Sequence, residues 1–198
     1  MRNRANREFS RYKYNPENHV NHVKEYNTMN IYYGQYEFPI GKIFISATDA
    51  GLFNLALGQH DLALNFANLS LKSDFTFIED PDRFEDLLVD LAGYFAGLPT
   101  DFNYPLDLRG ASPFERSIWE KARQIPYGQV RSYKWMAAQV HNPNASKAVG
   151  RALGMNPLPI IIPCHRVIMH DMSLGGFSAG AGWKEKLLMQ ERGELRIL

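Results

Sequence analysis

The most constraining feature of the sequence is the run NPLPIIIPCHRVI at residues 156–168, which holds the only cysteine of the chain. Its three consecutive isoleucines are apolar and β-branched, so the run predicts a short buried strand in the core. Pro163 lacks a backbone N–H and is expected to end that strand. Cys164 should therefore lie where the buried segment turns, at the floor of a pocket.

The residues beside Cys164 decide whether its thiol is inert or reactive. Burial alone makes a cysteine a small apolar side chain with a raised pKa. His165 and Arg166 follow it directly, and basic or cationic neighbours favour the reactive thiolate. Adjacent side chains of a regular strand point to opposite faces, so Cys164 and His165 act together only across a turn or a bridging water. For Arg166, a structural pairing and a direct role on the thiolate are both open.

The first half of the chain has the pattern of a small α/β domain. Residues 31–58 alternate β-branched and aromatic runs with Pro-Ile-Gly and Asp-Ala-Gly, which predicts a β-meander. An amphipathic helix is expected to start near Asp82. We therefore predict a basic flexible extension at 1–28, an α/β domain at 29–108 and a second domain at 109–198.

The second domain is predicted to be mainly helical. Ser112, Pro113 and Glu115 have the spacing of a capping box at the start of a helix. Two short helices follow, SYKWMAAQV with Ser132 as its cap and ASKAVGRALG, and the tight turn between them gives a helix-turn-helix. A further helix, WKEKLLMQERGEL, lies near the end of the sequence and contains Glu191, a candidate to orient His165.

The charge is distributed unevenly between the two domains. Residues 29–108 carry a net charge of −9, whereas residues 109–198 carry +7. From Lys121 to His170 there are seven Lys or Arg residues and no acidic residue. Such a segment favours a nucleic-acid partner over the simpler alternative, a solvated basic face.

Several classes of protein are disfavoured by what the sequence contains. One cysteine excludes an intramolecular disulfide framework and a cysteine-rich zinc site, so we expect no metal. The glycine-rich stretch at 173–182 lacks the P-loop lysine and the GxGxxG context, so we expect no nucleotide cofactor. The polar N-terminus and the lack of a spanning apolar run predict an intracellular, cytoplasmic protein.

Several of these motifs together resemble the O6-alkylguanine-DNA alkyltransferases, also called methylated-DNA–protein-cysteine methyltransferases. NPLPIIIPCHRVI, SLGGFSAG and KEKLLMQERG carry the resemblance, supported by SPFERSIW and IPYGQVRSY. It is strong over about 110–195 and loose over 30–108. It implies an RNase H-like small sheet followed by a helical domain with a helix-turn-helix and an active-site loop.

The resemblance also implies a role for each matching residue. Cys164 would be the nucleophile, His165 its base through a water, and Glu191 the group that orients His165. Asn156 would brace the active-site turn, and Tyr133 would press on the target phosphate and help protonate the leaving guanine. The residues implied to contact DNA are Tyr133, Lys134, Asn142, Lys147, Arg151 and His170, and those implied to form the base pocket are Val167, Phe177 and Ser178.

The implied activity is repair of double-stranded DNA by direct damage reversal. An O6-alkylguanine would be flipped out of the duplex, and its alkyl group would pass irreversibly to Cys164. O4-alkylthymine is a second candidate substrate. The product is a stable thioether, so the protein would act once, without a cofactor, and as a monomer.

Two departures from the family pattern leave other functions open. Lys147 stands where the family usually has an arginine that fills the gap left by the flipped base, and Phe177 stands where tyrosine is commoner. The alternatives are a non-catalytic alkylguanine-binding protein that recruits excision repair, a helix-turn-helix regulator, and a cysteine hydrolase. Each of these explains only one of the thiol, the basic half and the glycine-rich loop.

Overall fold

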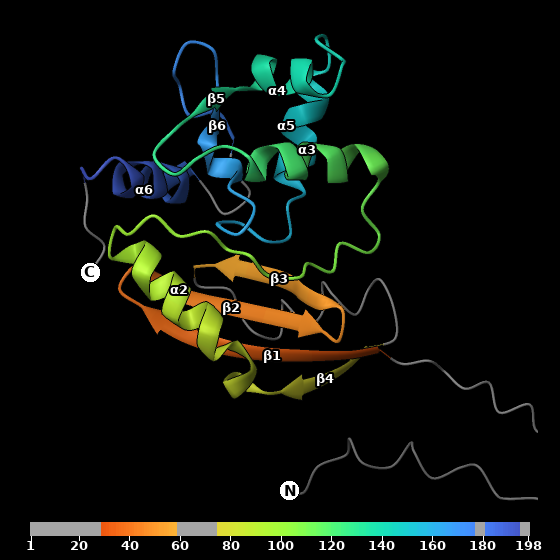
Figure 1. The fold of residues 1–198 in the computed structure, drawn as a ribbon, viewed down its shortest axis with the longest axis vertical. Helices are drawn as coiled ribbons and strands as arrows, with labels where there is room; N and C mark the ends of the chain where they lie inside the picture. The colour runs from red at the N-terminus through yellow and green to blue at the C-terminus, as the bar shows by residue number, and fades with distance from the viewer. Residues whose placement is uncertain (1–28, 59–74, 177–180, 195–198) are drawn as a thin grey trace, which may run out of the picture.

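The computed structural model describes residues 29–58, 75–176 and 181–194, so the predicted extension at 1–28 lies outside the described residues. The first half contains a four-stranded sheet with the order β3-β2-β1-β4 (Figure 1). Its strands are β1 (Met29–Phe38), β2 (Gly41–Thr48), β3 (Gly51–Leu57) and β4 (Phe75–Glu79). The first three form the predicted antiparallel meander, whereas β4, which was not predicted, pairs parallel with β1.

One helix lies across the sheet (Figure 1). It begins as a short 3-10 helix, η2 (Pro81–Phe84), and continues as α2 (Glu85–Phe95). Leu87, Leu91, Tyr94 and Phe95 are its buried residues. The predicted amphipathic helix is thereby confirmed, although its α-helical part starts three residues later than Asp82.

The second half lies beside the β3 edge of the sheet (Figure 1). Leu52 of β3 forms a parallel bridge with Leu106 of the linker, and the backbone N–H of Leu55 donates to the carbonyl of Pro157 at 2.8 Å. A Cβ on Gly51 would lie 2.3 Å from the carbonyl oxygen of Pro105, so only glycine fits where the linker meets this strand. The edge of the sheet thus joins the first half to the segment that leads to Cys164.

The second half is built on helices α3 (Pro113–Arg123), α4 (Tyr133–Gln139), α5 (Ser146–Gly154) and α6 (Ala181–Glu191), with 3-10 helix η3 (Cys164–Arg166) and the two-residue strands β5 (Arg131–Ser132) and β6 (Val167–Ile168). The predicted capping box is present, because Ser112 accepts from the N–H of Glu115 while the Glu115 side chain accepts from the N–H of Ser112. Trp119 donates to the carbonyl of Ala152 at 2.8 Å and ties α3 to α5. The predicted helix-turn-helix is confirmed as α4 and α5.

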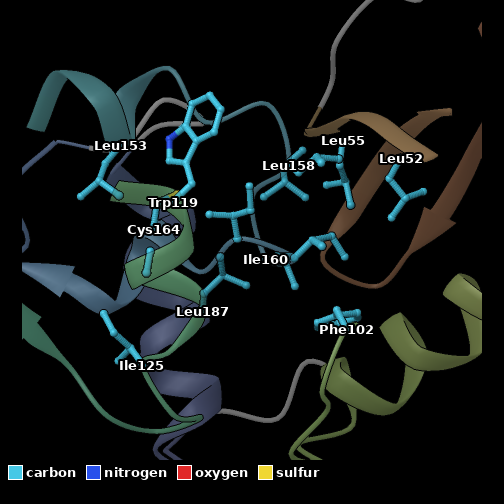
Figure 2. Close-up of a cluster of buried hydrophobic side chains, with 14 of the residues drawn as sticks. Leu52, Leu55, Phe102, Trp119, Ile125, Leu153, Leu158, Ile160, Cys164 and Leu187 are labelled. Carbon is cyan, nitrogen blue, oxygen red and sulfur yellow. The ribbon is translucent and has the colours of Figure 1, made fainter. Parts of the chain in front are cut away.

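The core is continuous between the two halves. Figure 2 shows Leu158 and Ile160 between the side chains of β3 and those of α3 and α6, within one buried cluster that includes Cys164. In the described parts of the chain, no helix is both long and apolar enough to cross a membrane.

The isoleucine run is buried as predicted, but it does not form the predicted strand. Residues 159–162 make a tight turn in which Ile160 has a φ of 75°. This left-handed conformation is unusual for a β-branched residue. Pro157, Pro159 and Pro163 cannot donate the hydrogen bonds of a strand, so the backbone turns instead.

Candidate active site

Cys164 is the first residue of η3, and its side chain is nearly fully buried. Asn156 donates to its sulfur from Nδ2 at 3.0 Å. Burial raises the pKa of the thiol to about 11, although the Asn156 hydrogen bond and the charge of Lys184 act in the opposite direction. The thiol is therefore protonated at neutral pH, and it needs a base to become a nucleophile.

Asn156 also organises the turn that carries the cysteine. Its Nδ2 donates to the carbonyl of Ile162 at 2.8 Å, and its Oδ1 accepts from the backbone N–H of Leu158 at 2.9 Å. The carboxamide thus spans the turn at residues 158–162 and the sulfur of Cys164. This position is suited to the bracing role that the family resemblance implies.

The carboxylate of Glu191 lies at the centre of a buried hydrogen-bond network. It accepts from His165 Nε2 at 2.7 Å, from Arg166 Nε at 3.0 Å and from the backbone N–H of Gly128 at 3.0 Å. Burial alone would raise its pKa, but the hydrogen bonds and charges of His165 and Arg166 lower that pKa to about 2. Glu191 is therefore ionised and acts only as an acceptor.

This network fixes the protonation of His165. Because ionised Glu191 can only accept, Nε2 of His165 carries the hydrogen that joins them. Burial lowers the pKa of the fully buried ring, which keeps the ring neutral. The lone pair is then on Nδ1, a buried atom with no hydrogen-bond partner among the described residues. His165 thus presents a neutral base on the side away from Glu191.

For Arg166, the sequence left open a structural pairing or a direct role on the thiolate, and the structure shows the structural pairing. Its Nε contacts both oxygens of Glu191, and its Nη1 donates to the carbonyl of Ile125 at 2.7 Å. Its guanidinium therefore holds α6 against the segment that follows α3.

Tyr94 is a member of the network that sequence reasoning missed. This buried residue of α2 donates from its hydroxyl to Glu191 Oε1 at 2.8 Å, and its oxygen lies 3.3 Å from His165 Nε2. Burial, reinforced by the charge of Glu191, raises its pKa well above the ordinary value, so the phenol keeps its hydrogen. The first half of the chain therefore reaches the candidate site directly.

A cavity of about 700 Å³ opens over the thiol. The residues that line it are Tyr133, Lys134, Ser146, Lys147, Gly150, Arg151, Leu153, Gly154, Cys164, Met169, His170 and Gly176. Five of the six residues implied to contact DNA thus surround the same cavity as the only cysteine. Lys147 and Arg151 both face it from α5, as their spacing predicts.

The other predicted site residues are placed differently. Asn142 lies in the exposed turn between α4 and α5 and does not line the cavity. Val167 is fully buried in β6, and Phe177 and Ser178 lie outside the described residues. Ser146, Met169 and buried Lys184 were not predicted, because nothing in their local sequence distinguishes them from ordinary helix or loop residues.

No group of three or more His, Cys, Asp or Glu residues that could hold a metal ion is found where the structure describes the chain. The arrangement is instead suited to nucleophilic chemistry. It combines one thiol, a neutral imidazole oriented by a carboxylate, and a cavity with cationic walls.

Two family models match the sequence in succession. Residues 31–108 match the 6-O-methylguanine DNA methyltransferase, ribonuclease-like domain, and residues 113–193 match the 6-O-methylguanine DNA methyltransferase, DNA binding domain. The methylated-DNA–protein-cysteine methyltransferase of Mycolicibacterium paratuberculosis is 38% identical over 162 residues, covering 82% of this chain and 93% of the relative. That of Methanosarcina barkeri is 37% identical over 166 residues, covering 84% of this chain and 100% of the relative.

Solved structures show the same similarity. The crystal structure of Mycobacterium tuberculosis OGT in complex with DNA matches with a TM-score of 0.70 and 35% identity, covering 83% of this chain and 93% of that chain. The crystal structure of Mycobacterium tuberculosis O6-methylguanine methyltransferase matches with a TM-score of 0.71 and 36% identity, covering 83% and 94% of the two chains.

The contact between Asn156 and the thiol gives a first testable prediction. Asn156→Ala removes a hydrogen-bond donor from the sulfur, so the pKa of Cys164 should rise further. A rise of about one unit would slow alkylation of the thiol by iodoacetamide about tenfold near pH 8. Asn103→Ala, at an exposed linker position, is the control. An unchanged alkylation rate in a folded Asn156→Ala protein would contradict this role.

Proposed function

Because the chain belongs to the methylated-DNA–protein-cysteine methyltransferase family, we propose that it repairs alkylated DNA by direct reversal, with Cys164 as the alkyl acceptor. The observation that supports this most is the position of the only cysteine, which borders a large cavity beside a neutral, carboxylate-held histidine. The substrate is double-stranded DNA that contains O6-alkylguanine, with O4-alkylthymine as a second candidate. The cavity is large enough for a flipped base, which in a duplex must leave the stack to be reached.

The proposed transfer begins with removal of the thiol proton. Nδ1 of His165 takes that proton from Cys164 through a water molecule, and Glu191 stabilises the imidazolium that forms. The thiolate then attacks the alkyl carbon, a C–S bond forms, and the bond from that carbon to O6 breaks. The electron pair passes to guanine, and Tyr133 at the cavity wall supplies the proton that lets guanine leave as the neutral base.

The product makes each molecule a single-use acceptor. A thioether is a stable bond, so the alkylated chain does not return to its starting state by the same chemistry. The transfer uses only the thiol and neighbouring side chains, and we therefore propose that it needs no cofactor. Action as a monomer in the cytoplasm, with access to the chromosome, belongs to the same proposal.

Cationic residues around the cavity support a DNA-binding role for the second domain, here taken as residues 109–198. Lys134, Lys147, Arg151 and His170 are exposed, and all four line the cavity. We propose that α5 enters a groove of the duplex while these side chains and Asn142 contact the backbone. A relative from Mycobacterium tuberculosis was crystallised in complex with DNA, which supports a DNA-binding role for this chain.

The most direct prediction concerns the fate of the alkyl group. After incubation with a duplex that contains one O6-methylguanine, peptide mass mapping should find one methyl group on the Cys164 peptide, saturating at one per protein. Cys164→Ser should bind the same duplex without becoming methylated. Tight damage-selective binding by a wild-type protein that stays unmodified would instead indicate a damage sensor. If the protein is neither methylated nor selective for the damaged duplex, the proposed function is excluded.

Lys147 gives a third prediction, because the family usually has arginine at this position. Lys147 is exposed on α5 at the cavity, where a planar guanidinium could stack in the gap left by a flipped base. Lys147→Arg should therefore stabilise the flipped state by about 1 kcal/mol, which is roughly fivefold in the single-turnover transfer rate at limiting protein. Lys186→Arg, on the exposed side of α6, is the control. Equal rates for Lys147→Arg and wild type would show that lysine fills the gap equally well.

A further inference from the structure

Lys184 of α6 is a fully buried lysine that the mechanism above does not use. Its ammonium donates to the carbonyl of Val167 at 2.6 Å and lies 3.5 Å from both the hydroxyl of Tyr133 and the carbonyl of Gly176. These three partners come from β6, from the start of α4 and from the segment after β6. The ammonium therefore sits where three separate parts of the cavity wall meet.

Among the described residues, no carboxylate neutralises the charge of Lys184. In the part of the chain that the structure describes, no acidic side chain lies within ion-pair distance of it, and its three partners are uncharged. Glu191, on the same helix, is already occupied by His165 and Arg166. A buried cation with only neutral partners is costly, and it strongly stabilises any negative charge that forms nearby.

Cys164 is the group at this cavity that forms such a charge. The positive charge of Lys184 lowers the pKa of Cys164, and Cys164 in turn raises that of Lys184, so the two groups interact electrostatically. Val167, which accepts the shortest hydrogen bond of Lys184, directly follows the 3-10 helix that begins at Cys164.

We propose that Lys184 is a positioning residue of the alkyl transfer, whose buried ammonium stabilises the Cys164 thiolate and holds Tyr133 against the cavity. This inference rests on the proposed function, because it assigns Lys184 to the same reaction.

The contact with Tyr133 has a direction that suits its proposed role. Lys184 donates, so the phenol oxygen accepts, and the single hydrogen of the phenol is left to donate elsewhere. The ammonium also lies 5.6 Å from the centre of the Tyr133 ring. Lys184 thus leaves the hydroxyl of Tyr133 free to give its proton to a base in the cavity.

The effect of Lys184 should depend on pH in a defined way. Burial lowers the pKa of Lys184 to about 8, opposed by Cys164, so its positive charge is present below that pH and is lost above it. The other groups near Cys164 are Tyr133, whose pKa is raised by burial, and neutral His165, which Glu191 and Arg166 hold. Stabilisation of the thiolate by Lys184 is therefore greatest well below pH 8 and declines as the pH rises through about 8.

The test compares Lys184→Met, which removes the charge from a chain of similar length, with Lys186→Met on the exposed side of the same helix. With a single cysteine, carbon-13 labelling of the cysteine Cβ gives one NMR signal that titrates with the thiol. Lys184→Met should raise the pKa of Cys164 and slow iodoacetamide alkylation about tenfold near pH 7. Lys186→Met should do neither. A folded Lys184→Met protein with an unchanged thiol pKa would overturn the proposal, since a purely structural lysine changes only stability.

A measurement on the wild-type protein tests the same inference if Lys184→Met does not fold. The ammonium should attract anionic iodoacetate more than neutral iodoacetamide, and the ratio of the two rates should fall as the pH passes about 8. His170 also lines the cavity, so His170→Ala serves as the background. A flat ratio in that background would overturn the proposal. Neither assay needs DNA, so failure of methyl transfer would disprove the proposed function separately.

Discussion

The arrangement of the candidate site depends on the hydrogen bonds that the ionised carboxylate of Glu191 accepts. Hydrogen-bond donors reach it from α2, from the loop after α3 and from the segment that carries the cysteine. Removing one partner of a buried ion pair typically costs about 3–5 kcal/mol, because the remaining charge is left without compensation. Through Tyr94, this carboxylate connects the N-terminal half of the chain to the candidate catalytic residues.

This arrangement separates protection of the thiol from its activation. Burial keeps Cys164 protonated, and a protonated thiol reacts slowly with stray electrophiles. The hydrogen bond to Glu191 leaves Nδ1 of His165 unprotonated and able to accept a proton. The ammonium of Lys184 favours the negative charge of the Cys164 thiolate. In the proposed reaction, the thiol becomes nucleophilic only after His165 accepts its proton.

The sequence predicted well those features that depend on local signals. The capping box of α3, the two helices of the helix-turn-helix and the meander of β1 to β3 all follow from residues close in the sequence. The isoleucine run is buried as predicted, but the prediction that it forms a strand was wrong. Its conformation is set by three prolines and by the side chain of Asn156, which the hydrophobic pattern does not reveal.

Residues that reach the site over long sequence distances could not be predicted in the same way. Tyr94 is 97 positions from Glu191, and within its helix it has only the spacing of a core residue. Lys184 lies in a helix among other charged residues, and nothing in the sequence separates it from exposed Lys186. The motif around Cys164 predicts a nucleophile at this position, whereas the positions of Tyr94 and Lys184 at the candidate site became evident only in the folded structure.

The central claim is that Glu191 holds His165 as a neutral imidazole with its hydrogen on Nε2, leaving Nδ1 as the base. Nitrogen-15 NMR of histidine-labelled protein measures this directly, with the His165 signals assigned by their loss in His165→Gln. The account predicts a protonated Nε2 and an unprotonated Nδ1 at neutral pH, and a weakened preference for this form in Glu191→Gln. A doubly protonated ring, or a neutral ring with its hydrogen on Nδ1, in the wild-type protein would contradict it.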